Sequence, residues 1–221
     1  MLRGTRVLIG DEVKEYNDAI NKFREVLNCD GFNEIIIPNM WNTETCTDKL
    51  GQEKSEKMWG FKDKAGRNCC LIPEVTGIIQ ELWNNGLNKT HGKLKLFYVQ
   101  RCYRYDRPQQ GRYREFTQIG VEILRNKITN ETRLEDKKEI YDALTKSLNC
   151  FSITYKLVEN VTRGISYYET PGFEVECNNL GAQKQIAGGG TYNEGQGWAV
   201  GVERILLSQT ITRNDMNKQK L

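Results

Sequence analysis

Two apolar segments of strand character flank a polar, arginine-rich loop, and this pair constrains the fold more than any other part of the chain. The segments are Leu96–Tyr105 and Glu115–Leu124, and the loop at residues 107–112 reads RPQQGR. Two such segments joined by a short loop that contains Pro and Gly predict an antiparallel hairpin. The chain therefore needs a sheet that includes this hairpin.

Further strand candidates follow one another with few helices between them. Lys57–Lys62 and Asn68–Ile72 predict a second hairpin around residues 63–66, and Glu34–Ile37 reads as a buried strand closed by Pro38. The later candidates are Phe151–Val158, Ile165–Glu169, Phe173–Cys177 and Gln185–Ala187.

Apolar residues three and four positions apart predict helices that cover the sheet. The first helix carries Val13, Tyr16, Ile20, Phe23 and Leu27 and ends near residues 28–31. The others are expected at about Glu74–Trp83, at about Leu134–Leu148 with Leu134 facing inward, and from about Glu203 onward. This order favours an α+β fold with a mixed, mainly antiparallel sheet flanked by helices. We expect one domain over residues 1–209, with a surface excursion at Asn126–Lys138, and a polar tail over residues 210–221.

Composition excludes several classes of protein. The 221 residues include 10 Tyr, 7 Phe and 4 Trp, too many aromatic side chains for a disordered chain. The longest purely aliphatic run, residues 35–37, excludes a membrane span, and the N-terminus carries no apolar signal region. The seven Cys form no Cys-x-x-Cys pair and His91 is the single histidine, which argues against a zinc site and for reduced thiols in the cytoplasm.

The net positive charge of the chain is small, but arginines are concentrated in one segment. The net charge is only +3, yet five arginines lie between Arg101 and Arg114, where Asp106 is the single acid. Arg104 lies in an apolar-flanked strand, so it either pairs with Asp106 or Glu122 or holds an anionic ligand.

Two glycine-containing segments leave similar alternatives open. Arg204 follows Gly197 and Gly201 near the start of the last helix, where it is either a surface residue or an anion ligand at a helix N-terminus. The segment AGGGTY at residues 187–192 is either a structural turn or a place where backbone approaches a ligand closely.

Taken together, these segments resemble the catalytic core of class II aminoacyl-tRNA synthetases, and within them the histidyl-tRNA synthetase family. RGT at residues 3–5 resembles the start of that family. The first helix followed by GFNEIIIP at 31–38 resembles motif 1, which forms the dimer interface. Residues 101–124 are similar to motif 2 over its whole length, and GWAVGVERILL at 197–207 resembles motif 3. RGISYY at 163–168 and AGGGTY at 187–192 look like the two signatures of the histidyl family.

The resemblance implies a site for ATP and Mg²⁺. It implies that Arg104 holds the α-phosphate, Arg204 the γ-phosphate, and Phe116 the adenine ring. Glu115 or Glu122 would lie near the nucleotide or the metal, although no residue is assigned as a dedicated metal ligand. Arg163 matches an arginine beside the reacting carboxylate, in chemistry that depends on placement and charge neutralisation.

The same resemblance implies a site for histidine and for an acceptor. The histidine-binding residues would be Glu74, Thr76, Gln118, Glu122, Arg163 and Tyr168, with Glu122 and Tyr168 on the imidazole nitrogens. The acceptor end of a tRNA would meet the loop residues Arg107, Gln109, Arg112 and Arg114. A homodimer through the motif 1 region is expected.

Several positions depart from the family pattern. Ile72 and Val75 replace an Arg and a Gly, Ser166 replaces an Asp, and Thr191 and Asn193 replace an Arg and an Asp. The region 125–150 is short where the family inserts a longer segment, and no anticodon-binding domain is expected after residue 221, so we expect a minimal core.

These departures leave more than one function open. The first is an enzyme that forms histidyl-adenylate and passes histidine to tRNA or another acceptor. A non-catalytic relative that acts as a histidine-binding regulatory or partner-binding subunit is the alternative. A truncated chain or split gene is a third interpretation, and a plain tRNA-binding protein is weaker because +3 attracts phosphates little.

Overall fold

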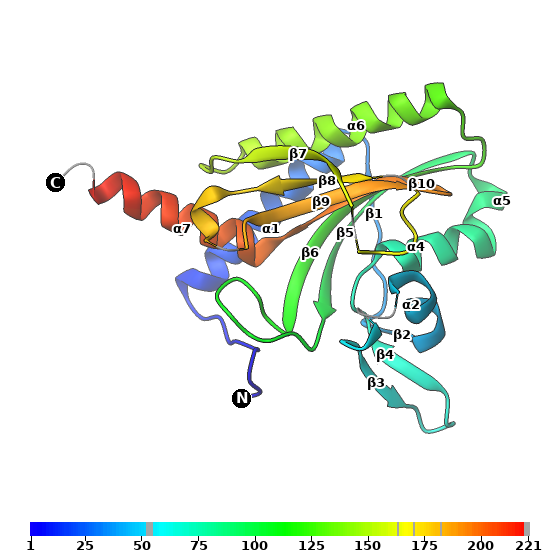
Figure 1. Ribbon diagram of the computed structural model, residues 1–221, viewed down its shortest axis with the longest axis horizontal. Coiled ribbons are helices and arrows are strands. Elements are labelled where there is room, and N and C mark those ends of the chain that lie inside the picture. The colour runs from blue at the N-terminus through cyan, green and yellow to red at the C-terminus, as the bar shows by residue number, and fades with distance from the viewer. Residues whose placement is uncertain (52–54, 163, 170, 182, 219–221) are drawn as a thin grey trace.

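The structure is a computed structural model that describes residues 1–51, 55–162, 164–169, 171–181 and 183–218 (Figure 1). Its central feature is a seven-stranded sheet in the order β1-β5-β6-β10-β9-β8-β7. The strands are β1 (Asn33–Glu34), β5 (Lys93–Tyr103), β6 (Glu115–Arg125), β7 (Lys156–Val161), β8 (Gly172–Glu176), β9 (Gln185–Tyr192) and β10 (Gly195–Gly201). Only β1 runs parallel to its neighbour, so the predicted mixed, mainly antiparallel sheet is confirmed.

The arginine-rich hairpin lies next to the middle of this sheet. β5 and β6 pair antiparallel from Tyr103↔Glu115 to Lys93↔Arg125, which confirms the predicted hairpin. Because side chains alternate along a strand, Ile119, Val121 and Ile123 point into the core on one face. Phe116 and Gln118 point to the opposite face.

Three helices cover the first of these faces. They are α1 (Asp11–Cys29), α6 (Asn130–Asn149) and α7 (Val202–Lys218). Phe23 and Leu27 of α1, Leu144 and Leu148 of α6, and Ile205 of α7 are buried in one cluster with the sheet. The apolar stripe predicted for the first helix is confirmed from Ile20 onward, whereas Val13 lies 37% exposed.

A smaller unit packs against the opposite face. It contains a three-stranded sheet ordered β2-β4-β3, made of β2 (Met40–Asn42), β3 (Trp59–Lys62) and β4 (Asn68–Leu71), and the helix α2 (Thr43–Leu50). The helix α4 (Thr76–Leu82) continues into the π-helical turn η1 (Trp83–Leu87), whose Gly86 has non-helical backbone angles, and then α5 (Asn88–Thr90). A 3-10 turn, η2 (Asn178–Leu180), follows β8. The predicted hairpin at residues 57–72 is confirmed as β3–β4.

Three predicted strands differ from the structure. The strand expected at Glu34–Ile37 is only β1, and Ile36 is 88% exposed because the chain leaves the sheet after Ile35 bonds to Phe97. Ile165–Glu169, which the structure describes in full, forms no strand and meets β9 through the isolated Tyr168↔Tyr192 bridge, with the Glu169 amide donating to the Thr191 carbonyl at 3.0 Å. The strand expected at Phe151–Val158 begins only at Lys156, because Phe151 packs into the core.

Two predictions about helices are also wrong in part. Leu134 is 70% exposed although it was expected inward, because α6 turns its Ile140 and Leu144 face to the sheet. The charged excursion at Asn126–Lys138 becomes helical from Asn130, where Thr129 caps α6. The backbone of residues 210–218 is helical as part of α7, and the boundary expected at residue 209 stays a prediction. Within the described residues, no helix is both long and apolar enough to cross a membrane.

Candidate active site

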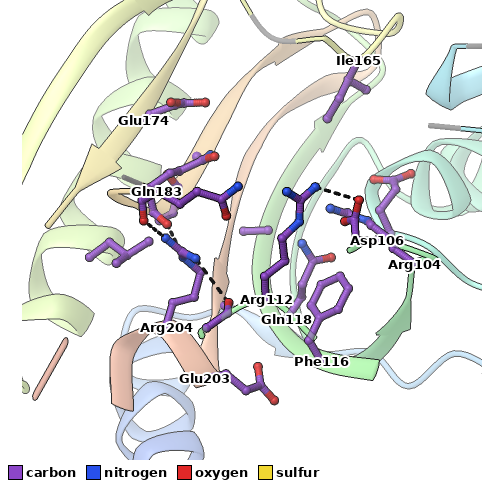
Figure 2. Close-up of a pocket in the computed structure, with 18 of the residues that line it drawn as sticks. Arg104, Asp106, Arg112, Phe116, Gln118, Ile165, Glu174, Gln183, Glu203 and Arg204 are labelled. Atoms are coloured by element: carbon purple, nitrogen blue, oxygen red, sulfur yellow. Dashed lines mark hydrogen bonds and ion pairs between the residues drawn. The ribbon is translucent and has the colours of Figure 1, made fainter. Parts of the chain in front are cut away.

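A cavity of about 520 Å³ opens on the sheet face that α1 and α6 leave uncovered (Figure 2). It lies over β5, β6, β9 and β10, between the loop after β5 and the start of α7. Eight residues predicted from the sequence line it: Glu74, Thr76, Arg104, Arg112, Phe116, Gln118, Tyr168 and Arg204. Strand alternation explains how Phe116 and Gln118 reach the same cavity.

One end of the cavity is built around Glu74. Its carboxylate accepts hydrogen bonds from the backbone amides of Thr76 at 3.1 Å and Gly77 at 2.9 Å, at the N-terminus of α4. The Tyr167 hydroxyl donates to the same carboxylate at 3.1 Å. A helix N-terminus favours a negative charge, so this end of the cavity holds a fixed carboxyl group that suits an ammonium group.

Glu122 lies immediately behind this end and is fully buried. Its carboxyl group receives hydrogen bonds from the Thr76 hydroxyl at 2.5 Å and the Tyr192 hydroxyl at 2.7 Å. Burial raises the pKa of Glu122 to about 8, because desolvation penalises the charged form more than the two hydroxyl donors favour it. Glu122 does not line the cavity. Its hydrogen bond with the Thr76 hydroxyl fixes a residue that does.

Gly197 is required where β10 crosses Glu122. A Cβ added to Gly197 would lie against the Glu122 carboxylate and the Val121 carbonyl oxygen. We expect Gly197→Ala to lower the free energy of unfolding by about 2–3 kcal/mol, because neither the backbone nor the buried carboxylate can move away. Urea denaturation measures this, with Gly92→Ala as the matched control because a Cβ there meets nothing within 4 Å. Equal stability of the two variants would contradict the expectation.

The other end of the cavity is lined by arginines. Arg104 donates from Nε to the Pro73 carbonyl at 2.8 Å, and its guanidinium lies 5.1 Å from the centre of the Phe116 ring. Neither Asp106 nor Glu122 pairs with Arg104 in the described part of the chain. Asp106 instead accepts a 2.7 Å bond from Arg112. The ion pair considered for Arg104 is thus not formed, and its charge faces the cavity.

Arg204, in the first turn of α7, lies at the same arginine-lined end of the cavity, close to Gly111 and Arg112. Its guanidinium donates only to carbonyl oxygens in the described residues, namely those of Gln183, Gln185 at 2.5 Å and Gly111 at 3.2 Å, as Figure 2 shows. Burial lowers the pKa of Arg204, and Arg112 lowers it further by repulsion between like charges. Arg204 is thus half-buried rather than a surface residue, and it adds positive charge to this end.

The remaining predicted residues lie outside the cavity lining. Glu115 pairs with Arg101 at 2.7 Å, Arg107 and Gln109 lie exposed on the loop, and Arg114 donates to the Asp106 and Arg3 carbonyls. Arg163 lies outside the described residues, so its role stays a prediction. The segment at residues 187–192 is part of β9, so the interpretation as a turn was wrong.

The residues predicted near Mg²⁺ do not fit a protein-built metal site. Glu115 is occupied by Arg101, and Glu122 is buried, raised in pKa and bonded to Thr76 and Tyr192. The described residues contain no group of three or more His, Cys, Asp or Glu side chains that could hold a metal ion. We therefore assign neither glutamate to a metal.

Sequence reasoning missed several residues that shape the site. Tyr98 and Tyr167 line the cavity, and Tyr192 supports Glu122. Burial raises the pKa of all three tyrosines, so their hydroxyls stay protonated. Tyr98 could have been found from the period of two along the first hairpin strand, because it points to the same face as the cavity.

Comparisons with known proteins agree with this arrangement. Residues 4–154 match the family model described as Histidyl-tRNA synthetase. A histidine–tRNA ligase from Archaeoglobus fulgidus is 26% identical over 303 positions, which cover 92% of this chain and 74% of that protein. Since 303 exceeds 221, that relative carries internal residues with no counterpart here. A histidine–tRNA ligase from Methanosarcina acetivorans is 30% identical over 83% of this chain, which spans only 48% of that relative.

Solved structures share the fold at low identity. The apo histidyl-tRNA synthetase of S. aureus gives a TM-score of 0.76 at 23% identity, over 94% of this chain and 69% of that one. An ATP phosphoribosyltransferase regulatory subunit/histidyl-tRNA synthetase from Bacillus halodurans gives 0.73 at 15% identity, over 93% of this chain and 82% of that one. The fold, the motifs in their order and the family match lead to one conclusion: the chain belongs to the histidyl-tRNA synthetase family.

Proposed function

We propose that the chain binds histidine and ATP in the cavity and joins them as histidyl-adenylate. The observation that carries the proposal is the distribution of charged side chains in the cavity. Glu74 and Thr76 form an acidic, hydrogen-bonding end, and Arg104, Arg112 and Arg204 gather at the other end. Of the carboxylates in the lining there, Asp106 pairs with Arg112 and Glu203 with Arg6, and Glu174 and Glu176 of β8 lie along the wall. Such a cavity suits a substrate with an ammonium group at one end and a second substrate with a chain of phosphates at the other.

In the proposed reaction, each group has a defined task. The histidine ammonium would bind at Glu74 and Thr76, with Gln118 and Tyr168 beside it. A carboxylate oxygen of histidine attacks the α-phosphorus of ATP, a new P–O bond forms, and the bond to the leaving pyrophosphate breaks. Arg104 would neutralise charge at the α-phosphate while Phe116 stacks on adenine, and Arg204 would bind the γ-phosphate. Placement and charge supply the catalysis, and no protein nucleophile is needed.

Transfer of histidine to a tRNA would follow as a second step. The half-buried Arg112 and the exposed Arg107 belong to a loop at the mouth of the cavity, where arginines suit the phosphates of an acceptor strand. The cytoplasm is the proposed location. A homodimer through the motif 1 helix and strand, that is α1 and residues 31–38, is also proposed, and the 88% exposure of Ile36 is compatible with it.

Histidine-dependent exchange of labelled pyrophosphate into ATP tests the first step. The purified protein should catalyse exchange with histidine and not with the other amino acids, because the Tyr168 and Gln118 side chains at the cavity wall suit imidazole nitrogens. Arg163→Ala should abolish the exchange if that residue acts beside the reacting carboxylate. No exchange with any amino acid would contradict the proposal.

A histidine-binding regulatory subunit is the second candidate. It is favoured by the structural similarity to the Bacillus halodurans protein and by the carbonyl oxygens that already surround the Arg204 guanidinium. Calorimetry separates the two candidates. Binding of histidine together with binding of ATP supports the enzyme, whereas histidine binding with no ATP binding supports the regulatory subunit.

A further inference from the structure

Residues 3–6, which we name the N-terminal strap, lie against the loop between β5 and β6 (Figure 1). The backbone amide of Arg114 donates to the Gly4 carbonyl at 2.7 Å, and the Arg114 guanidinium donates to the Arg3 carbonyl at 3.2 Å. Gly4 has a φ of 88°, and a Cβ added there would lie 2.9 Å from side-chain carbons of both Pro108 and Arg114. The strap therefore fits closely against both sides of the loop.

The side chain of Arg6 extends this contact to α7. Its guanidinium donates to the Glu203 carboxylate at 3.1 Å and lies 4.6 Å from the centre of the Tyr113 ring. The Glu203 side chain is only 5% exposed, and its two oxygens also accept bonds from the Thr117 amide at 3.1 and 3.0 Å. Arg6 is thus the ion-pair partner of a buried carboxylate.

These contacts join the two elements that carry the arginines of the cavity. Tyr113 and Arg114 belong to the loop that also bears Arg112, whereas Glu203 is the neighbour of Arg204. The same elements also meet directly where Arg204 donates to the Gly111 carbonyl and Leu207 lies beside Gly111. A bound phosphate would compete with that carbonyl for the Arg204 guanidinium. Tyr113 and Glu203 also line the cavity, but their contacts with Arg6 use none of the guanidinium groups of Arg104, Arg112 and Arg204, so these contacts can persist when the cavity is filled.

We propose that the N-terminal strap sets the spacing between Arg112 and Arg204, with Arg6 as a positioning residue that acts through Glu203 and Tyr113. The inference rests on the proposed function, because the ligand whose affinity it sets is the triphosphate of ATP. Arg6 touches none of the reacting groups in this arrangement. Removal of the Arg6 side chain should therefore weaken the binding of ATP at the arginine-lined end and leave the binding of histidine at Glu74 and Thr76 unchanged.

Steady-state pyrophosphate exchange tests the inference with three variants. Arg6→Ala should raise KM for ATP about tenfold or more and leave KM for histidine within twofold, because a displaced loop weakens alignment at one end only. Arg6→Lys keeps the charge and should recover part of the loss. The control is Arg67→Ala, which removes an arginine–aspartate ion pair on the β3–β4 turn and should change neither KM. An unchanged KM for ATP in Arg6→Ala, or equal rises in both KM values, would overturn the proposal.

Hydrogen exchange gives a readout that needs no activity. In Arg6→Ala the amides of Arg114 and Thr117 should exchange at least tenfold faster than in wild type, while the β3–β4 amides stay unchanged. Gly4→Ala should give the same local effect through the positive φ and the close carbons of Arg114. Unchanged protection in both variants contradicts the inference. If the wild type shows no pyrophosphate exchange but the variants still lose amide protection, only the proposed function is contradicted.

Discussion

Arg104→Ala is expected to lower the rate of histidine-dependent pyrophosphate exchange by about a thousandfold. The Arg104 guanidinium has no carboxylate partner in the described structure and is fixed by the Pro73 carbonyl and the Phe116 ring. A charge held in place before the substrate arrives stabilises the pentavalent transition state without reorganisation, so its removal affects the chemical step directly.

Two further variants make this result specific. Arg104→Lys should restore only a small part of the activity, because an ammonium cannot bond Pro73 and a phosphate oxygen in the planar geometry of a guanidinium. Arg67→Ala removes a surface arginine and should keep full activity. Calorimetry should give the same histidine affinity for Arg104→Ala as for wild type. If the folded Arg104→Ala protein loses less than tenfold in the rate of pyrophosphate exchange, the role proposed for Arg104 is wrong.

Glu122 should make the stability of the protein fall as pH rises. Burial raises its pKa from 4.5 in the unfolded chain to about 8 in the folded protein. Between these values the folded state holds a proton that the unfolded state has lost. The stabilisation is therefore fully present below pH 4.5 and is lost as the pH approaches 8. The change amounts to about 5 kcal/mol over this range.

The matched variant is Glu122→Gln, which cannot titrate. Urea unfolding of both proteins at several pH values between 5 and 8 gives the difference in free energy of unfolding, in which all other groups cancel. The free energy of unfolding of the wild type should fall relative to that of Glu122→Gln as the pH rises. A difference that is constant with pH, or one that moves in favour of the wild type, would mean that Glu122 is ionised in the fold.

The hairpins and the first helix could be predicted because their signals are local. Two β-type segments around RPQQGR leave few alternatives, and the spacing from Ile20 to Leu27 specifies one helix face. Glu34–Ile37 was predicted too long because an apolar run of this length does not reveal whether a neighbouring strand continues beside it. The glycines at residues 188–190 suggested a turn, whereas they let β9 lie flat against Tyr168 and β10.

The sequence predicts several of the residues that line the cavity, but it does not predict which of them bond to one another. Arg104, Gln118 and Arg204 could be selected from motif resemblance, and all three line the cavity. The hydrogen bonds of Glu122, however, join it to Thr76, which is 46 positions away in the sequence, and to Tyr192, which is 70 positions away. The contact of Arg6 with Glu203 spans 197 positions. No local pattern encodes such pairs, because they depend on which strands become neighbours.

The pairing of β6 with β10 has a consequence for biogenesis. This ladder joins Gln118 to Gly201 and Leu124 to Gly195, so it closes a long loop of intervening chain. On a ribosome, β6 emerges long before its partner, and its free edge lies beside an apolar face during that interval. The cavity cannot form until β10 and Arg204 have been synthesised, so its arginine-lined end is completed only after β6 has been in place for some time. The proposed ligands, ATP and histidine, could therefore stabilise the fold only after β10 has paired with β6.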